Sequence, residues 1–266
     1  MPDQNSPALL QVSRLFKSFP SRRGGEPIEV LRDVSFSLHA GESLGIVGES
    51  GSGKTTVAKI AAGIISATSG EIRFEGRTID SKRLRADRRA IRYIYQEAVA
   101  ALDPSMTIRR ILEEPLKLYG LRSRTAPEAQ LAELLGAVGL RPELLKRHPR
   151  ELSGGQCQRI GIARALAGDP KILICDEPTS ALDAATQRQV LELLQELKER
   201  RGISYLFITH NLAVAKFMTD SVMVMRRGRI VESGRTADVF ADPRDAYTKA
   251  LLAAMPRVDI PFFPVD

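Results

Sequence analysis

The sequence predicts an α/β protein in which helices cover both faces of a parallel sheet. Three observations support this fold class. A glycine-rich turn, Gly48–Thr55, stands between a short apolar run and a segment with helical propensity. Strand-like and helix-like segments alternate again after about residue 170, and a stretch of helical character, 98–152, lies between these two parts. We therefore expect a strand-and-helix core that is interrupted by a helical insertion.

The turn Gly48–Thr55 reads Gly-Glu-Ser-Gly-Ser-Gly-Lys-Thr, which is the pattern of a phosphate-binding loop. Residues 43–47 before it predict a buried strand, and residues 56–62 after it predict a helix. Glycines let successive N–H groups point at one anion, and the helix N-terminus adds partial positive charge. Lys54 would reach the β- and γ-phosphates of a nucleoside triphosphate, and Thr55 would place its hydroxyl on Mg²⁺. A glycine-rich turn that matches by chance is the alternative, which the flanking strand and helix disfavour.

The residues before this loop predict two strands, over 9–19 and 30–38, joined by a loop rich in glycine and arginine. Segment 71–77 alternates in polarity, which predicts an exposed antiparallel strand. The densest basic block, 82–92, fits a solvated helix face better than a nucleic-acid site, because no aromatic-and-basic platform for stacking bases accompanies it.

The stretch 98–152 predicts helices. Apolar residues near helical spacing predict a helix over 108–119, which Pro115 is expected to kink or split. Thr125 and Glu128 predict a capping box at the start of the next helix. We expect these helices to be an insertion and not a separate domain.

The remainder of the chain returns to strands and helices in turn. Residues 171–175 predict a buried strand, and residues 186–201 predict an amphipathic helix. Two further strands are expected over 204–208 and 221–225. Strands and helices that alternate around a triphosphate loop favour a parallel sheet.

Length, charge and cysteine content narrow the class of protein. The chain of 266 residues can form one large domain or two small ones, and its net charge of +7 fits nucleic acid, an anionic membrane surface or only a nucleotide. No apolar run approaches the roughly 20 residues needed to cross a bilayer, and the N-terminus has no secretory signal. Cys157 and Cys175 are far apart and form no metal-ligand pair. We therefore expect a cytosolic protein with free thiols.

Two carboxylates end the predicted strand 171–175. Asp176 can hold Mg²⁺ directly or through water, and Glu177 would lie further toward the γ-phosphate, where a carboxylate can polarise the attacking water. An ordinary acidic turn is the alternative. The phosphate-binding loop upstream favours the metal ligand and the base.

The stretch Leu152-Ser153-Gly154-Gly155-Gln156 is the most specific in the sequence. A serine and two glycines that open a helix predict a second anion-binding helix start. One chain does not obviously need two phosphate-binding sites for a single triphosphate. From about Leu9 to Met255 the chain resembles the nucleotide-binding subunit of an ATP-binding-cassette (ABC) transporter. The motifs that carry the resemblance, in the family's order and spacing, are Gly48–Thr55, Gln96, Leu152–Gln156, Asp176-Glu177, Ser180-Ala181-Leu182-Asp183 and His210.

The resemblance implies a P-loop NTPase (RecA-like) core with a parallel sheet, an antiparallel β subdomain and an inserted α-helical subdomain. The expected boundaries are a single nucleotide-binding domain over 9–257, with tails 1–8 and 258–266. Its expected parts are a core with the antiparallel β part over 9–96 and 156–235, a helical subdomain over 97–155 and a C-terminal segment over 236–257.

The resemblance also implies that ATP and Mg²⁺ bind between two such subunits, which face head to tail. Gln96 would contact Mg²⁺ and the attacking water, Glu177 would be the base, and His210 would hold the γ-phosphate. The residues assigned to the nucleotide are Phe19, Gly48, Ser50, Gly51, Gly53, Lys54, Thr55, Thr56, Ser153, Gly154, Gly155, Gln156 and Asp183. Among these, Phe19 would stack on adenine and Asp183 would cross the dimer interface. The residues assigned to the metal are Thr55, Gln96 and Asp176.

One departure from the family's pattern lies beside the site. His210 is followed by Asn211, where the family usually has aspartate. We interpret this as a change next to the site that leaves activity in place, because Glu177 and His210 are both present.

The implied function is that of an ATPase that energises a membrane transporter. Two segments resemble those of ABC subunits from importers of peptides or nickel. They are Gln96-Glu97 with 101–104, and the C-terminal segment 242–256, although Asp245-Ala246 stand where His-Pro is common. The implied partners are a second ATPase subunit (a copy or a paralogue), two integral membrane permease subunits and, indirectly, an extracytoplasmic solute-binding protein. The chain would lie at the cytoplasmic face of the membrane and bind no nucleic acid. Peptides and nickel or its chelates stay open as cargo.

The competing class is a soluble ABC ATPase without a permease, acting on nucleic acid or protein assembly. Such proteins usually carry long coiled coils, zinc sites or two cassettes in one chain, and this sequence shows none of these. A P-loop kinase would not explain Leu152–Gln156.

Overall fold

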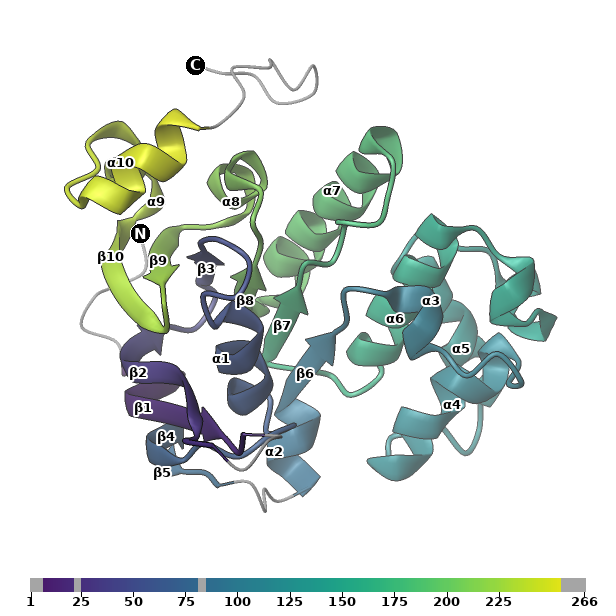
Figure 1. The fold of residues 1–266 in the computed structure, drawn as a ribbon. Coiled ribbons are helices and arrows are strands. Elements are labelled where there is room, and N and C mark those ends of the chain that lie inside the picture. The colour runs from purple at the N-terminus through teal and green to yellow at the C-terminus, as the bar shows by residue number, and fades with distance from the viewer. Residues whose placement is uncertain (1–6, 22–24, 81–84, 255–266) are drawn as a thin grey trace. The chain divides into compact units, whose positions relative to one another are not determined.

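The chain divides into two compact units in the computed structural model, which describes residues 7–21, 25–80 and 85–254. The first unit joins residues up to 83 with those from 204 onward, and the second unit spans 84–203 (Figure 1). Several predicted segments lie partly or wholly outside the described residues: most of the tail 1–8, residues 82–84 of the basic block, Met255 and Pro256 of the C-terminal motif, and the tail 258–266.

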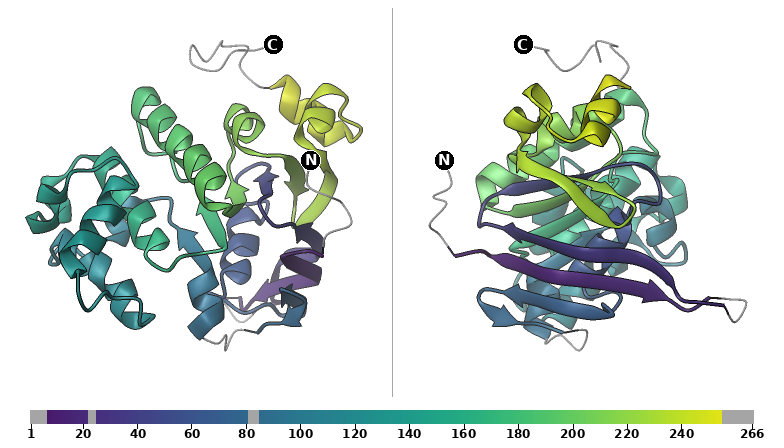
Figure 2. Two further views of the ribbon diagram at one scale, coloured as in Figure 1. Left: turned by 180° about the vertical axis from the view of Figure 1, so that it is seen from behind. Right: turned by 60° about the vertical axis from the view of Figure 1, so that its left-hand side comes forward.

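An antiparallel sheet forms one part of the first unit, with strand order β2-β1-β4-β5. Its strands are β1 (Leu10–Phe19), β2 (Ile28–Leu38), β4 (Ser69–Phe74) and β5 (Arg77–Thr78). The long strands β1 and β2 lie side by side in the right-hand view of Figure 2, and Leu10 of β1 pairs with Leu38 of β2. Both residues are fully buried. Along each strand, buried positions are separated by exposed or half-buried ones. The predicted strands over 9–19 and 30–38 are confirmed. The exposed strand predicted over 71–77 is confirmed only in part, because β4 ends at Phe74, a turn at residues 75–76 separates it from β5, and Ile72 and Phe74 are buried.

A second sheet in this unit is built around β3 (Ser43–Val47), the strand before the phosphate-binding loop. Strands β8 (Ser204–Ile208) and β9 (Ser221–Arg226) flank β3 and run parallel to it, and β10 (Arg229–Arg235) pairs antiparallel with β9. Every residue of β3 and β8 is buried, as expected for parallel strands covered on both faces. The helices described in this unit are α1 (Lys54–Ala61), α8 (Leu212–Met218), α9 (Thr236–Ala241) and α10 (Ala246–Ala253). Helix α1 packs against β8, and α8 packs against β3.

The second unit pairs β6 (Ile91–Ile94) with β7 (Ile172–Asp176) in parallel register. Its described helices are α2 (Arg85–Ala90), α3 (Ala98–Ala101), α4 (Ile108–Leu118), α5 (Pro127–Gly136), α6 (Gly154–Leu166) and α7 (Ala184–Arg201), with short 3₁₀ turns η1 (Pro142–Lys146) and η2 (Pro149–Glu151). Helices α3, α4, α5 and α7 all contact α6.

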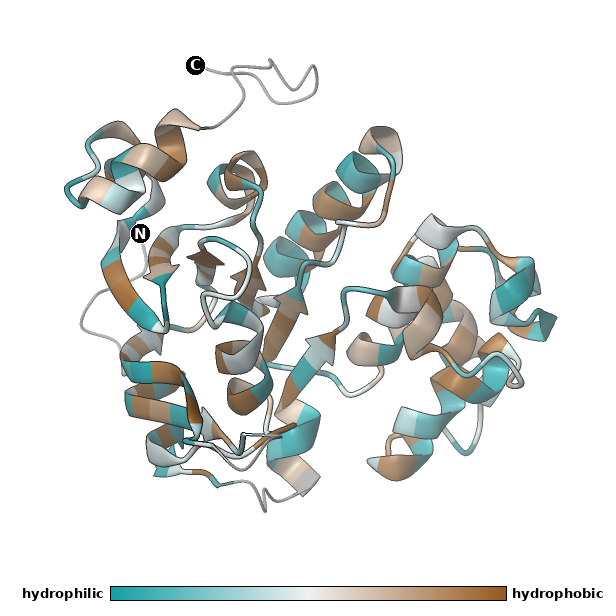
Figure 3. Cartoon of the chain, in the orientation of Figure 1, coloured by the Kyte–Doolittle hydropathy of each residue, from teal (hydrophilic) through white to brown (hydrophobic). Residues whose placement is uncertain are grey.

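Helix α7 shows how the sequence sets the bounds of an element. The side chain of Asp183 caps its N-terminus, and Gly202 ends it in the left-handed conformation with φ of 63°. Val190, Leu194 and Leu197 are buried on one face, and the helix alternates between teal and brown along its length in Figure 3. Among the described residues, no helix combines the length and the apolar character that a bilayer span requires.

Two sequence predictions for the helical insertion have different outcomes. Pro115 is expected to kink or split its helix, and α4 continues through Pro115, so the helix is not split; a kink there stays a prediction. The burial of Pro115, Leu112 and Leu116 offsets the cost of a proline inside a helix, which is about 3 kcal/mol. The capping box at Thr125 does not form, and no side chain caps α5. Glu128 instead forms a two-bond ion pair with Arg109 of α4.

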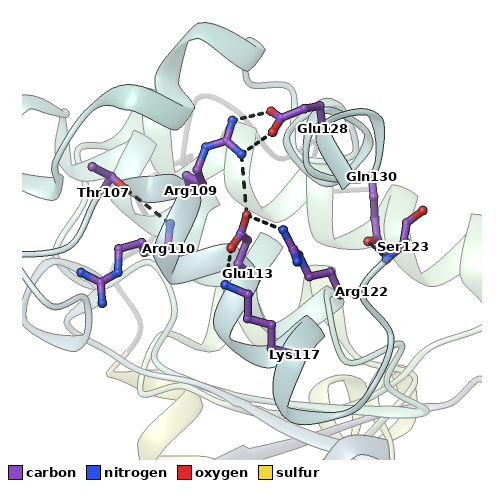
Figure 4. A network of polar contacts seen from close by, with 9 residues as sticks. All are labelled: Thr107, Arg109, Arg110, Glu113, Lys117, Arg122, Ser123, Glu128 and Gln130. Carbon is purple, nitrogen blue, oxygen red and sulfur yellow. Dashed lines mark hydrogen bonds and ion pairs between the residues drawn. The ribbon is translucent and has the colours of Figure 1, made fainter. Parts of the chain in front are cut away.

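A charged network ties α4 to α5 (Figure 4). At its centre, Glu113 is only 7% exposed and lies 2.5 Å from Lys117 Nζ, 3.6 Å from Arg109 and 3.8 Å from Arg122. Arg109 also binds Glu128 on α5. The hydrogen bond from Lys117, followed by the charges of Arg122 and Arg109, holds the pKa of Glu113 below its ordinary value of 4.5.

We expect Glu113→Gln to lower the stability of this unit at neutral pH by about 1.5–3 kcal/mol, the range for a hydrogen bond to a charged group. The pKa of Glu113 is lower in the folded state than in the unfolded state, so its contribution is complete above pH 4.5 and is lost as pH falls through the lowered pKa. Urea unfolding of both proteins along a pH series measures this difference, which should shrink in acid. Glu114→Gln is the control, since Glu114 is exposed on the same helix. A difference that does not change with pH would contradict the assignment.

Candidate functional site

The phosphate-binding loop joins β3 to α1 in the first unit. Gly48, Gly51 and Gly53 have φ of 146°, 78° and 106°, values that L side chains rarely adopt. A Cβ on Gly48 would lie 2.2 Å from the carbonyl oxygen of Met225, and a Cβ on Gly53 would lie 2.7 Å from Leu31 Cδ2. Glycine is therefore required at these two positions both by the backbone conformation and by the close approach of neighbouring atoms.

Lys54 is 5% exposed, and its Nζ donates hydrogen bonds of 2.8 Å to the carbonyl oxygens of Gly48 and Glu49. A cation is thus fixed against the start of a glycine-rich loop. The hydroxyl of Ser52 in the same loop is buried and has no hydrogen-bond partner among the described residues. A buried ammonium and an unsatisfied hydroxyl beside a helix N-terminus fit the oxygens of a phosphate group.

Apart from Phe19 on β1, the other predicted nucleotide-binding residues of this unit lie in the loop, on α1 or just after β8. Ser50 is exposed, and Thr55 and Thr56 are half-buried in the first turn of α1. His210 is exposed and follows β8. Since β3 and β8 are parallel neighbours, the loop and His210 both follow the carboxyl ends of adjacent strands.

Asn211, the departure from the family's pattern, has a clear local role. Its Oδ1 accepts hydrogen bonds from the N–H groups of Ala213 at 3.0 Å and Val214 at 3.3 Å, and so caps α8. Asparagine and aspartate are about equally good N-caps, which explains why asparagine is compatible with the fold here.

Phe19 ends β1 and is 36% exposed. Lys17 Nζ lies 4.6 Å from the centroid of the Phe19 ring, within the range of a cation–π interaction. Adenine stacking on Phe19 stays a prediction.

Asp176 is the last residue of β7 in the second unit and is 4% exposed. It accepts a 2.5 Å hydrogen bond from the hydroxyl of Tyr93 on the adjacent strand β6. Burial and this hydrogen bond raise the pKa of Tyr93, so its hydroxyl stays protonated and holds the carboxylate in place. Sequence reasoning missed Tyr93; its position on the strand just before Gln96 was the only available signal.

Glu177 and Gln96 come together in the second unit. Gln96 Nε2 lies 3.4 Å from Glu177 Oε2 and donates a hydrogen bond to it. Glu177 has φ of 47°, a left-handed conformation that costs a non-glycine residue about 1–2 kcal/mol. A strained carboxylate held by an amide at the end of a buried strand is typical of a functional site.

The predicted second anion site forms the start of α6. Ser153 Oγ accepts from Gln156 N at 3.3 Å and Gln156 Oε1 accepts from Ser153 N at 3.0 Å, which together form a capping box. Ser153 and Gly154 are exposed. Gly155 is buried, and a Cβ there would lie 2.4 Å from Thr186 Cγ2. The packing of the chain's own helices therefore already requires glycine at 155, whereas Gly154 is open to a partner.

Asp183 has a role within its own chain. Its Oδ1 accepts a 3.0 Å hydrogen bond from Thr186 N at the start of α7. Hydrogen bonds from Thr186 hold the pKa of Asp183 below its ordinary value. A role across a dimer interface stays a prediction.

A pocket of about 330 Å³ lies within the second unit. Residues from three segments, 96–100, 154–158 and 178–182, line it. Gln158 is one of them, and its Nε2 is buried without a partner among the described residues. The pocket brings Gln96, the start of α6 and the residues after Glu177 around one space.

Comparison with known proteins gives consistent matches. A family model described as ABC transporter matches residues 31–180. The oligopeptide transport ATP-binding protein OppF of Haemophilus influenzae is 43% identical over 266 aligned residues, covering 96% of this chain and 80% of that protein. A putative peptide import ATP-binding protein of Brucella ovis is 42% identical, with coverage of 94% and 80%, and OppF of Lactococcus lactis is 42% identical, with 95% and 82%. A dimeric, post-hydrolysis structure of the ATP-binding cassette MJ0796 bound to ADP and Pi aligns with a TM-score of 0.76 at 30% identity, covering 85% of this chain and 98% of that one.

Proposed function

Since this chain belongs to the ABC transporter family as an ATP-binding subunit, we propose that it hydrolyses ATP to drive a membrane importer of short peptides. The relatives named above are peptide or oligopeptide transport proteins, which favours peptides over nickel and its chelates as the cargo. The single observation that carries the hydrolytic role is the hydrogen bond between Gln96 and Glu177 at the end of β7.

Glu177 is the general base in this proposal. Its carboxylate polarises the water that attacks the γ-phosphate, and the amide of Gln96 fixes the orientation of that carboxylate. Glu177 also keeps a left-handed backbone, a strained conformation of the kind that is retained at active sites. The hydrolytic step therefore depends on a carboxylate that is positioned before substrate arrives.

The nucleotide is held by the residues of the first unit. Lys54 and the loop N–H groups bind the β- and γ-phosphates, His210 contacts the γ-phosphate, and Phe19 stacks on adenine. The buried ammonium of Lys54 supports this assignment, because its bonds to the carbonyl oxygens of Gly48 and Glu49 fix a positive charge beside the loop that would hold the phosphates.

Mg²⁺ would be held by Thr55, Asp176 and Gln96. These residues offer hydroxyl, carboxylate and amide oxygens, the ligands that this hard cation prefers. When bound, the ion would neutralise charge on the β- and γ-phosphates. Tyr93 contributes by orienting the Asp176 carboxylate.

A second ATPase subunit, a copy of this chain or a paralogue, completes each site. Ser153 and Gly154 are exposed at the N-terminus of α6, where N–H groups and the helix dipole attract an anion. We assign this surface to the ATP that is bound by the phosphate loop of the neighbouring subunit. Gln156 holds Ser153 in its capping position, and Asp183 contacts the neighbour across the interface.

Two permease subunits use the energy of ATP hydrolysis to move the peptide. The chain binds them at the cytoplasmic face of the membrane, and a solute-binding protein on the far side delivers the peptide. Coupling arises because ATP and the permease both favour the closed pair of ATPase subunits. This arrangement needs no nucleic-acid partner.

Peptide uptake tests the proposal. Cells that lack the gene should lose import of a labelled tripeptide, and the wild-type gene but not Glu177→Gln should restore it. A tagged chain should copurify with integral membrane proteins. Loss of nickel uptake with intact peptide uptake would contradict the cargo, and copurification with nucleic acid and no membrane protein would favour a soluble ABC ATPase instead.

A further inference from the structure

A tyrosine near the C-terminus touches the phosphate-binding loop. Tyr247 lies on α10 and is 8% exposed, and its ring packs in an apolar cluster with Val47 and Val224. Its hydroxyl accepts a 3.0 Å hydrogen bond from the backbone N–H of Glu49, 198 residues earlier in the chain. All of these residues belong to the first unit.

The backbone of Glu49 is held on both sides of its Cα atom. Its N–H is bound by Tyr247, and its carbonyl oxygen accepts from Lys54 Nζ at 2.8 Å. The hydroxyl on α10 and the ammonium that would bind phosphate are therefore linked through one loop residue.

The turn between β9 and β10 supports the same region. The N–H of Gly228 donates to the carbonyl oxygen of Ser52 at 3.0 Å. The guanidinium of Arg226 lies 4.7 Å from the centroid of the Tyr247 ring. The loop is thus braced at Glu49 and at Ser52 by residues that come from the C-terminal part of the chain.

Helix α10 is itself fixed in place. Asp245 caps it by accepting from the N–H groups of Tyr247 at 2.8 Å and Thr248 at 3.4 Å. Glu232 on β10 accepts from the N–H groups of Arg244 at 2.7 Å and Asp245 at 3.1 Å. A chain of hydrogen bonds therefore runs from β10 through the cap of α10 to the tyrosine.

We propose that Tyr247 is a positioning residue for the phosphate-binding loop, so that the docking of α10 sets the affinity for ATP. A glycine-rich loop has many conformations, and fixing Glu49 reduces the entropy that binding must otherwise remove. The proposal rests on the nucleotide-binding function, because Tyr247 acts only through the loop and through Lys54.

Tyr247→Phe tests it, since this change keeps the ring, its packing and its contact with Arg226 and removes only the hydroxyl. The loss of one hydrogen bond is expected to raise the Kd for ATP about fivefold. The KM for ATP should rise in parallel, while kcat at saturating ATP stays unchanged, because the base is not touched. Isothermal titration and steady-state kinetics measure the two effects.

Tyr119→Phe is the matched control. The Tyr119 hydroxyl also accepts a hydrogen bond, here from the Arg92 guanidinium at 2.6 Å, and this guanidinium also lies over the ring, but Tyr119 belongs to the second unit. Both variants should shift the urea midpoint, and only Tyr247→Phe should weaken ATP binding.

Unchanged or tighter ATP binding by Tyr247→Phe would overturn the proposal, as would equal weakening by Tyr119→Phe. Lys54→Ala separates this outcome from a failure of the proposed function. If Lys54→Ala abolishes binding and Tyr247→Phe has no effect, the tyrosine assignment alone is wrong. If Lys54→Ala also leaves binding intact, the nucleotide site itself is wrong.

Discussion

Replacement of Glu177 by glutamine is expected to slow ATP hydrolysis about 10²- to 10⁴-fold, the usual effect of removing a general base. Glutamine keeps the size of the side chain and its ability to pair with Gln96, but it cannot take a proton from water. ATP binding should persist, because Lys54 and the loop are unchanged. The variant should therefore hold ATP in a closed pair of subunits, which size-exclusion chromatography with bound-nucleotide analysis detects.

Glu192→Gln is the control for this variant. It removes a carboxylate from the same unit, but Glu192 pairs with Arg188 on the exposed part of α7. Hydrolysis should stay at the wild-type rate. If Glu177→Gln hydrolysed ATP at a near-normal rate, Glu177 would not be the base.

Glutamate in place of Gly154 is expected to reduce hydrolysis about 10²- to 10³-fold, the effect of losing a preorganised anion site. A Cβ at Gly154 meets only Leu182 Cδ2 at 3.7 Å, an ordinary contact, so the chain's own fold accepts a side chain there. A carboxylate in the first turn also favours the helix. The fold should keep its stability while the anion site faces a negative charge, and ATP should still bind to the variant's own phosphate loop.

Gly136→Glu is the matched control, because Gly136 is an exposed glycine with open space around its Cβ in the same unit. Gly155 is a poor choice for this test, since a side chain there would meet Thr186 at 2.4 Å and disturb folding. Full activity of Gly154→Glu would mean that the start of α6 does not face a nucleotide.

Sequence patterns predicted the strand-loop-helix around Lys54 because each of its signals is local. Continuous apolar runs identified β3, β7 and β8, and the glycine pattern identified the turn between β3 and α1. The exposure of Ser153 and Gly154 agrees with a site that faces outward. The sequence does not reveal the packing role of Gly155, because its contact with Thr186 joins two helices and leaves no local signal.

Other features depend on contacts that sequence spacing does not reveal. Pro115 stays within a helix because tertiary burial outweighs a local penalty. The hydroxyl groups of Tyr93 and Tyr247 reach residues 83 and 198 positions away, so neither could be recognised from its neighbours. Both residues hold a group that the sequence did predict, the Asp176 carboxylate and the phosphate-binding loop.

The central claim is that each ATP lies between the phosphate loop of one cassette and the Ser153-Gly154 surface of the other. An ATPase assay on two kinds of dimer, isolated by two different tags, tests it. One dimer carries Lys54→Ala on one cassette and Gly154→Glu (or the matching glycine of a paralogue) on the other; the second dimer carries both changes on the same cassette. Shared sites predict hydrolysis by the first dimer and none by the second. Hydrolysis by the second and none by the first would show that each cassette forms a complete site alone.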